Sequence, residues 1–465
     1  MKYPSITELV LRDGQQSLIA TRMRLSDMTP ILSKLDNIGF SSLEVWGGAT
    51  YDCCLRYLNE NPWKRLKVIK SNIKKTKLQM LLRGKNLVGY KKYDDSVINL
   101  FIKESSKNGI SIFRIFDALN DINNISYSIK CANKYDANSQ GTISYTTSPI
   151  HNEKYWLKLA KDIEDIGAKS LGIKDMAGLL KPKTAYSLIK KLKKNLSIPI
   201  HLHTHATTGL SDATNFKAFE AGVDNIDTSI SSFSNLYGHT ATESLISMIY
   251  DNNDNPFNMD ELAEISDYFQ NIRIKYSQYE GSMKGVDIKM LINQVPGGML
   301  SILQKQLFDL NKTDKFDDLV KEIPRIRKDV GYIPLVTPTS QIIGAQALLN
   351  ILDNQRYKNI NKEFIDLVNG DYGKIPGKVN TSLKRIVESK SNSTNDETLT
   401  IENARVNFKE HCVKNNLKAL YKNDTDLLNF IFFPKESIEF YKKSSALSMN
   451  DLIKLQEGFG FYMSD

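Results

Sequence analysis

Cysteine is scarce in this chain of 465 residues, which has four, at positions 53, 54, 131 and 412. None of them forms a C-x-x-C pair, and four scattered thiols cannot supply the dense framework of a disulfide-stapled secreted domain. Cys53 and Cys54 are expected to pack against neighbouring side chains and not to act as nucleophiles. The scarcity of cysteine predicts a protein of the reducing cytoplasm.

Long apolar runs are absent as well. No uninterrupted stretch approaches the ~18 apolar residues that a membrane-spanning helix requires. The first residues, MKYPSITELVLRDGQQS, lack a long apolar segment followed by a small-residue cleavage site, so we expect no export signal. An apolar fraction of 41% and a charged fraction of 25% are typical of a soluble globular protein.

Basic runs with interleaved aromatic residues are also missing, although the net charge is +9. The lysines cluster in segments such as KKLKKN and IKKTK, which are typical of solvated helix faces. We therefore expect no nucleic-acid partner.

The first half of the chain contains a regular alternation of two patterns. Short runs rich in β-branched and apolar residues are each followed by a longer stretch with helical periodicity. The runs cover residues 6–13, 41–48, 78–84, 111–118, 139–148, 170–178, 198–205 and 225–232. Eight such units predict an α/β fold, a (β/α)8 TIM barrel. A doubly wound open sheet is the alternative, and it is disfavoured because no glycine-rich phosphate loop follows the first strand.

From about residue 255 the pattern changes to helices joined by short turns. We predict a barrel domain over residues 1–300 and a mostly helical C-terminal domain over residues 301–465 that completes the active site. Within the second domain, the polar tract ESKSNSTNDET at 388–398 predicts a loose loop.

Histidine is rare, and its distribution is uneven. Of the six histidines, three fall in the segment IPIHLHTH, at alternate positions of one predicted strand. Because residues two apart on a strand share a face, His203 and His205 are expected to lie about 6 to 7 Å apart and to ligate one ion at the barrel mouth. His201 is one step deeper and is expected to form part of the wall. A strand with merely buried histidines is the alternative, and it is disfavoured because burying three half-polar rings without partners is costly.

Asp13 and Lys174 lie where two other predicted strands end. Barrel closure brings the first strand close to the seventh, so Asp13 is the natural carboxylate ligand. An unmodified lysine ammonium would repel a divalent cation. Lys174 is therefore expected either to form an ion pair with an acid such as Asp175 or to be carboxylated into an anionic ligand.

These residues belong to longer motifs spread over nearly the whole chain. They include LRDGQQSLIATRMR (11–24), SLEVWGGATYDCCLRYL (42–58), LQMLLRGKNLVGY (78–90), GIKDMAGLLKP (172–182), HLHTHATTG (201–209), NQVPGGMLS (293–301) and PLVTPTSQIIG (334–344). Through these motifs the chain resembles the carboxyltransferase domains of biotin-dependent enzymes that interconvert pyruvate and oxaloacetate. Pyruvate carboxylase, the oxaloacetate decarboxylase α subunit and the large carboxyltransferase subunit of transcarboxylase belong to this family.

The resemblance implies a divalent metal, most commonly zinc, with manganese or cobalt in some relatives. Its implied ligands are Asp13, a carboxylated Lys174, His203 and His205.

The resemblance also implies roles for residues around the substrate. Arg83 would pair with the keto-acid carboxylate and, with Gln16 and Tyr90, organise the reacting end. Thr337 would relay a proton between biotin and the enol, and Asp52 and Ser340 would lie toward the biotin pocket. The structural alternatives are a barrel salt bridge for Arg83, a stacking wall for Tyr90 and a helix cap for Thr337.

Two departures from the pattern of full-length pyruvate carboxylases point to one branch of the family. Gln15 replaces a histidine, and Ala206 replaces an acid after the histidine pair. We therefore predict a subunit most like the oxaloacetate decarboxylase α subunit without its biotin domain. The sequence has no Ala-Met-Lys-Met biotinylation motif, so biotin is expected on a separate carrier protein. The carboxyltransferase subunit of a pyruvate carboxylase, a transcarboxylase subunit and a catalytically degenerate scaffold subunit are the alternatives.

An acyl-CoA-dependent lyase is a further alternative, disfavoured because such barrels lack the Lys174 motif. The expected partners are pyruvate or oxaloacetate, the biotin carrier, and either a biotin carboxylase or membrane decarboxylase subunits that would hold the protein at the inner membrane. Relatives pair their barrels, so a homodimer is expected. The segment SSFSNLYGHTATES (231–244), after the eighth strand, lacks an expected glycine-rich stretch and carries none of the proposed ligands.

Overall fold

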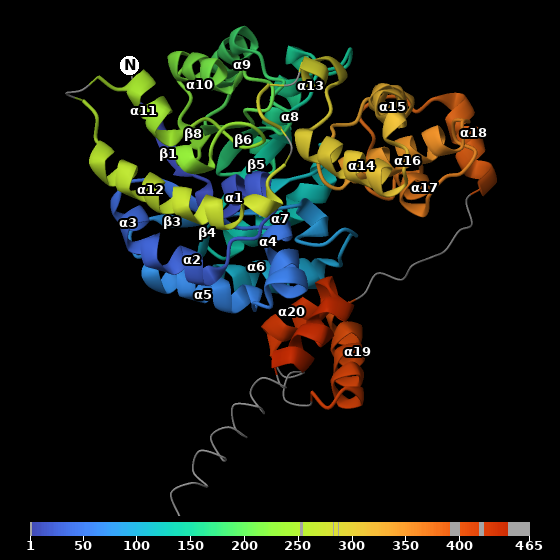
Figure 1. Cartoon of the computed structure of the whole chain (residues 1–465), viewed down its shortest axis with the longest axis horizontal. Coiled ribbons are helices and arrows are strands. Elements are labelled where there is room, and N and C mark those ends of the chain that lie inside the picture. Colours follow the sequence, from blue (N-terminus) through green and yellow to red (C-terminus); the bar gives the residue numbers. More distant parts are fainter. Residues whose placement is uncertain are drawn as a thin grey trace, which may run out of the picture.

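Eight parallel strands close into a barrel in sequence order, and β8 pairs with β1 (Figure 1). The computed structural model describes residues 2–251, 254–281, 283–286, 288–390, 400–417 and 423–444. The strands are β1 (Ser5–Glu8), β2 (Ser42–Trp46), β3 (Lys77–Leu82), β4 (Ile110–Phe116), β5 (Asn138–Ser144), β6 (Ser170–Asp175), β7 (Ile200–Thr204) and β8 (Asn225–Thr228). Each predicted run overlaps one of them, so the (β/α)8 barrel is confirmed.

Helices surround the barrel and protect it from solvent (Figure 1). Several begin at an Asn or Asp whose side chain accepts hydrogen bonds from the first-turn amides, as Asn61, Asp94 and Asp121 do. The helices of this part are α1 (Gln15–Ile19), α2 (Leu25–Met28), α3 (Leu32–Asn37), α4 (Gly48–Cys53), α5 (Pro62–Asn72), α6 (Asp95–Lys107), α7 (Ile122–Lys134), α8 (Glu153–Asp165), α9 (Pro182–Asn195), α10 (Ser211–Glu220), α11 (Thr242–Ile249) and α12 (Met259–Lys275).

The interior of the barrel is polar, and its buried side chains form hydrogen bonds and ion pairs with one another. Glu44 accepts hydrogen bonds from Arg12 Nε at 2.6 Å and from Gln79 Nε2 at 2.9 Å. Arg114 donates to Gln140 Oε1 at 2.5 Å and also pairs with Asp227. Such paired burial avoids the cost of isolated charges in a low-dielectric interior and leaves a rigid floor beneath the mouth.

A separate lobe of helices lies beside the barrel mouth, on the right of Figure 1. It comprises α13 (Ile288–Asn293), α14 (Gly297–Asp309), α15 (Phe316–Asp329), α16 (Thr339–Leu352), α17 (Lys362–Asn369) and α18 (Thr381–Lys390). Its apolar core includes Leu307, Ile323, Ile343 and Phe364, together with Leu119 from the barrel. The mostly helical character predicted for this half is confirmed.

Near the end of the described residues, α19 (Ile401–Lys414) and α20 (Asp424–Phe432) pack on the barrel and share its apolar core. Tyr51 donates a hydrogen bond to Asn429 Oδ1 at 2.5 Å, and the Phe432 ring contacts Phe101 edge-on. The two largest apolar cores of the described residues thus do not divide the chain at one point, and the domain boundary at residue 300 stays a prediction.

Residues 388–390 of the predicted loop end α18, and the rest of that loop lies outside the described residues. None of the described helices has the length and apolar character needed to cross a bilayer.

Candidate active site

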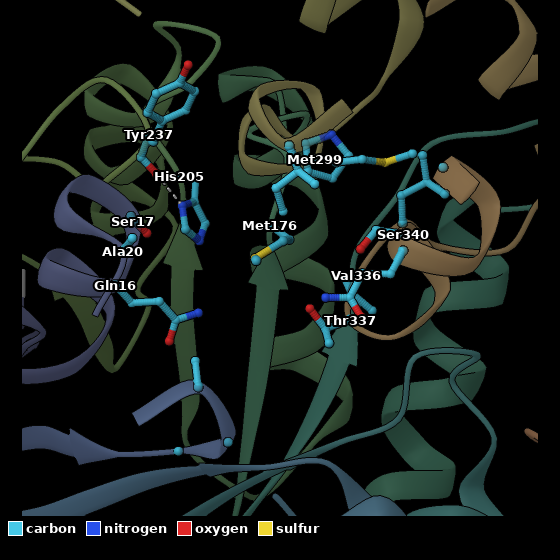
Figure 2. A pocket seen from close by; sticks show the side chains of 18 of the residues that line it. Gln16, Ser17, Ala20, Met176, His205, Tyr237, Met299, Val336, Thr337 and Ser340 are labelled. Carbon is cyan, nitrogen blue, oxygen red and sulfur yellow. Dashed lines mark hydrogen bonds between the residues drawn. The ribbon is translucent and has the colours of Figure 1, made fainter. Parts of the chain in front are cut away.

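The carboxyl ends of the strands open into a cavity of about 700 Å³ between the barrel and the helical lobe. Parallel barrels position their functional side chains at this end. In Figure 2, Gln16 and His205 line one side of the opening, and Thr337, Ser340 and Met299 line the other. The segment between α15 and α16 brings Thr337 to the mouth, so the lobe completes the cavity.

At the floor of the mouth, four buried side chains present ligand atoms to one point. One carboxylate oxygen and three imidazole nitrogens lie within 4.8 Å of one another, and the residues are Asp13, His203, His205 and His239. Asp13 Oδ2 is 3.3 Å from His203 Nε2 and 3.8 Å from His205 Nε2. The structure therefore brings together three of the four metal ligands proposed from the sequence.

Hydrogen bonds on the far side of each ring orient the predicted histidine ligands. His203 Nδ1 lies 2.8 Å from Asp227 Oδ2, and His205 Nδ1 lies 2.8 Å from the Tyr237 carbonyl oxygen. The Asp227 and Tyr237 oxygens are acceptors, so we assign the ring proton to Nδ1 in each case; Arg114 Nη1 also lies 3.2 Å from His203 Nδ1. The Nε2 lone pairs then face Asp13, as in histidines that bind metal through Nε2.

The electrostatics of the cluster suit a divalent cation. Burial lowers the pKa of His203 to about 4 and that of His205 well below its ordinary value, so both rings are neutral near pH 7. Burial alone would raise the pKa of Asp13, but the charges of Arg12 and Lys174 outweigh it and hold the pKa well below its ordinary value. His205 Nε2 is buried and makes no hydrogen bond to any described residue, and Asp13 Oδ2 forms an ion pair with Arg12 Nη2 at 2.9 Å. An oxygen and nitrogen donor set of this kind fits zinc and similar ions.

Lys174 lies beside the cluster and faces into the barrel. Its Nζ is 2.9 Å from His203 Nε2 and 3.7 Å from Asp13 Oδ2, and burial lowers the pKa of the amine to about 8. The ion pair with an acid that was one alternative for Lys174 is formed with Asp13 and not with Asp175, because neighbouring residues on a strand point to opposite faces. Asp175 instead accepts hydrogen bonds from the Leu179 and Leu180 amides, each at 2.8 Å.

Arg83 lines the same cavity, and its guanidinium can bind an anionic substrate there. Its Nη1 donates to the Gly89 carbonyl oxygen at 2.5 Å, and its guanidinium carbon lies 5.1 Å from the centre of the Tyr90 ring. A Cβ atom at Gly48 would come within 1.9 Å of Arg83 Nη2, so the missing side chain at this position makes room for the guanidinium. Gln16 also lines the cavity and accepts a hydrogen bond from Arg12 Nη1 at 3.3 Å.

The lobe contributes hydroxyl groups to the opposite wall. Thr337 lines the cavity, and its side chain makes no hydrogen bond within the described part of the chain. It does not cap α16, whose N-cap residue is Pro338 and whose first turn receives no side-chain cap hydrogen bond. Ser340 lines the cavity one helical turn further along.

Asp52 stays apart from the other predicted site residues. Its carboxylate accepts a hydrogen bond from Arg56 Nε at 2.9 Å, and it is absent from the described residues that line the cavity. Its role near the biotin pocket remains a prediction. His201 lies outside the metal cluster, and Cys53 has a thiol whose pKa burial raises to about 11.

Sequence reasoning missed His239. The segment after the eighth strand carries none of the ligands proposed from the sequence, but its His239 Nε2 lies 3.5 Å from Asp13 Oδ2. A signal was present, because His239 is one of only six histidines and follows a strand that barrel closure places beside β1 and β7. The roles of Arg114 and Asp227 beneath His203 depend on side-chain pairing across the barrel, which the spacing of residues does not reveal.

Comparison with known families divides the chain into two segments. Residues 4–269 match the family described as HMGL-like, and residues 290–462 match the family described as a conserved carboxylase domain. The first match spans the barrel, and the second spans the lobe and the segment that follows it.

Two known proteins are similar over most of their length. A pyruvate carboxylase subunit of Methanocaldococcus jannaschii is 46% identical over 443 residues, which cover 94% of this chain and 77% of that protein. The methylmalonyl-CoA carboxyltransferase 5S subunit of Propionibacterium freudenreichii subsp. shermanii is 42% identical, covering 94% of this chain and 87% of that subunit.

A solved structure has the same fold. The carboxyl transferase domain of Rhizobium etli pyruvate carboxylase, determined with pyruvate and biocytin, superimposes with a TM-score of 0.89 at 30% identity. The match covers 96% of this chain and 78% of that one.

Proposed function

We propose a reaction for this chain on the premise that it belongs to the biotin-dependent carboxyltransferase family of the pyruvate carboxylase and transcarboxylase 5S subunits. The reaction moves a carboxyl group between biotin on a separate carrier protein and the methyl carbon of pyruvate, forming or consuming oxaloacetate. One observation carries this proposal. Three groups line one cavity: the Arg83 guanidinium, which can bind a carboxylate, His205 of the metal-binding cluster, and the Thr337 hydroxyl, which has no partner among the described residues.

Arg83 binds the keto acid in this account. A guanidinium can grip a carboxylate through two parallel hydrogen bonds, which fixes both position and orientation. Tyr90 forms the wall next to it, and Gln16 offers its amide to the carbonyl end from the opposite side of the mouth. The positive charge also stabilises the enolate that forms when the methyl group loses a proton or oxaloacetate loses its carboxyl group.

Asp13, His203 and His205 would hold a divalent metal, most commonly zinc, with manganese or cobalt as alternatives. When bound, the ion would polarise the keto group and order the mouth. Lys174 would add a fourth ligand as a carbamate. Its burial and lowered amine pKa of about 8 support this proposal, because CO2 reacts with the neutral amine and more of that form is present near pH 7.

Thr337 would move the proton that the exchange of a carboxyl group requires. Its hydroxyl can both donate and accept, and it faces the cavity without another partner among the described residues. Ser340 follows on the same wall and would contact the biotin ring, a role also assigned by resemblance to Asp52.

The carboxylation of pyruvate is the direction we favour, because the Methanocaldococcus jannaschii relative at 46% identity is a pyruvate carboxylase subunit. Oxaloacetate decarboxylation is the second candidate, supported by Ala206 after the histidine pair. The acyl-CoA lyase alternative is disfavoured because the lobe, which completes the cavity, matches a carboxylase family. The complete cluster argues against a degenerate scaffold.

A biotin carrier and a biotin carboxylase are the partners that the favoured direction requires. Membrane decarboxylase subunits would replace the carboxylase in the second candidate. The homodimer and the cytoplasmic location remain predictions from the sequence.

Oxaloacetate decarboxylation in the presence of free biotin tests the shared half-reaction. The metal-loaded protein should release pyruvate at a rate that rises with biotin concentration. An Arg83→Lys variant keeps the charge but loses the paired donors, so we expect KM for oxaloacetate to rise about tenfold or more. Turnover that is independent of biotin would contradict the proposal.

A further inference from the structure

His239 is the fourth member of the buried cluster, and neither the sequence motifs nor the roles proposed above account for it. It lies in the loop after β8, which pairs with the residue that follows β7. The Ala206 amide donates to the Gly238 carbonyl oxygen at 2.8 Å, and the Asn235 amide donates to the His239 carbonyl oxygen at 2.7 Å. The side chain is fully buried. Its backbone is therefore held against the strand that carries the other two histidines.

The far side of the His239 ring fixes its tautomer. Nδ1 lies 3.0 Å from the Thr204 carbonyl oxygen, which can only accept a hydrogen bond. The proton of a neutral ring then lies on Nδ1, and Nε2 presents a lone pair. This arrangement matches that of His205, whose Nδ1 faces the Tyr237 carbonyl oxygen.

The near side of the ring faces the metal-binding point. His239 Nε2 is buried and has no hydrogen-bond partner among the described residues. It lies 3.5 Å from Asp13 Oδ2. This distance is close to the 3.3 Å between the same oxygen and His203 Nε2, a predicted ligand atom. Two ligands held at 2.0 to 2.1 Å in a tetrahedral zinc site are about 3.3 to 3.5 Å apart. The distance from His239 Nε2 to Asp13 Oδ2 therefore fits two ligands of one ion. A purely structural His239 could hold the loop against β7 through Nδ1 and its backbone, and would not require an Nε2 without a hydrogen-bond partner.

We infer that His239 is a metal ligand, and that Asp13, His203, His205 and His239 hold the ion whether or not Lys174 is carboxylated. This inference rests on the metal site of the proposed function and adds an order of events to it. Lys174 Nζ lies 2.9 Å from His203 Nε2 and 3.7 Å from Asp13 Oδ2 in the unmodified protein, where an ammonium competes with the ion. Four residues of the chain would hold the ion first, and Lys174 would take up CO2 afterwards.

Titration of the metal-free protein with Co2+ in CO2-depleted buffer tests the inference without any substrate. The readouts are the stoichiometry, the affinity and the visible absorption of bound Co2+. We expect the wild-type protein to bind one ion, with affinity changed less than about threefold by added bicarbonate. The His239→Gln variant should bind about 10- to 100-fold more weakly. Lys174→Met, which cannot form a carbamate and lacks the competing charge, should bind as tightly as wild type or more tightly.

His201→Gln is the matched control, because His201 lies on β7 with the ligand His203 but outside the cluster, and the affinity of this variant should stay within about threefold of wild type. Thermal unfolding of each metal-free variant separates loss of a ligand from loss of the fold. Wild-type affinity that depends on bicarbonate, or affinity lost in Lys174→Met and kept in His239→Gln, would overturn the inference and leave the proposed function intact. A wild-type protein that binds no Co2+ would overturn both.

Discussion

His203 Nδ1 lies 2.8 Å from Asp227 Oδ2, deep inside the barrel. Asp227 is held in turn by Arg114, whose Nη2 donates to Oδ1 at 3.0 Å. A carboxylate behind a metal-binding histidine fixes its tautomer and raises the basicity of the ligand nitrogen. Asp227 and Arg114 thus orient His203 so that its Nε2 lone pair faces the metal-binding point in the metal-free protein.

Replacing Asp227 with Asn should weaken metal binding by about 10- to 100-fold. The amide would leave the buried Arg114 guanidinium without its anionic partner and remove the charge behind His203. Competition against a chromophoric chelator measures the change. Asp162→Asn, on the outer face of α8, is the control and should bind metal like the wild type. Equal affinity for all three proteins would show that Asp227 does not support the ligand.

A methyl group at Gly48 should displace Arg83. The Cβ atom would lie 1.9 Å from Arg83 Nη2 and 2.9 Å from the Val88 carbonyl oxygen, so the guanidinium must move. We expect KM for oxaloacetate to rise at least about tenfold, because the paired hydrogen bonds to the carboxylate are lost. Steady-state kinetics with free biotin measure this change.

Gly47→Ala provides the comparison, since a Cβ there has contacts of 3.5 Å or more. Its KM should change less than about threefold. Similar KM values for the two variants would argue against the displacement of Arg83 as the cause.

The hydroxyl of Thr337 should be required for turnover but not for metal or substrate binding. Thr337→Ala should lower kcat by about 10²- to 10⁴-fold, the range for loss of a proton-transfer group. Thr337→Ser retains the hydroxyl and should keep most of the activity. Pre-steady-state and steady-state assays of oxaloacetate decarboxylation distinguish the two. Equal rates for the alanine and serine variants would exclude the hydroxyl from the proton transfer.

His151 should make the fold sensitive to acid, independently of the active site. Burial lowers its pKa from 6.5 to about 4, and its side chain is only 6% exposed, stacked on Trp156. The unfolded chain takes up a proton below about pH 6.5, whereas the folded protein does not until about pH 4. The contribution of neutral His151 to the free energy of unfolding is therefore fully present above about pH 6.5. It is lost as the pH falls through about 4, and the total loss is about 3 kcal/mol.

Denaturant unfolding of the metal-free protein between about pH 7 and pH 4 checks this effect. His151→Gln should flatten the dependence of the unfolding free energy on pH. His411→Gln, at an exposed position of α19, should leave the dependence unchanged. An identical pH dependence in wild type and His151→Gln would contradict the assignment.

The barrel and part of its site follow from local patterns in the sequence. Each strand leaves a run of apolar and β-branched residues, and alternation on β7 is enough to place His203 and His205 on one face. Barrel topology then brings Asp13 near them. Local patterns do not predict contacts between side chains from different strands. Lys174, for example, pairs with Asp13 and not with the adjacent Asp175.

The packing of the C-terminal half was also beyond local patterns. Helices α15, α17 and α18 have amphipathic patterns in the sequence, but an amphipathic face does not indicate which partner covers it. Contacts of Phe432 and Asn429 with the barrel assign α20 to the barrel core. His239 was overlooked for a similar reason, because its loop has no periodicity and its position is set by pairing with His205.

Isotope exchange between labelled pyruvate and oxaloacetate, catalysed by the metal-loaded protein with free biotin, tests the central claim most directly. The claim is that one cavity binds the keto acid at Arg83 and exchanges its carboxyl group with biotin near Thr337. We predict exchange that requires both biotin and the metal and that falls about 10²-fold or more in Thr337→Ala. A metal-loaded wild-type protein that shows no biotin-dependent exchange would contradict the account.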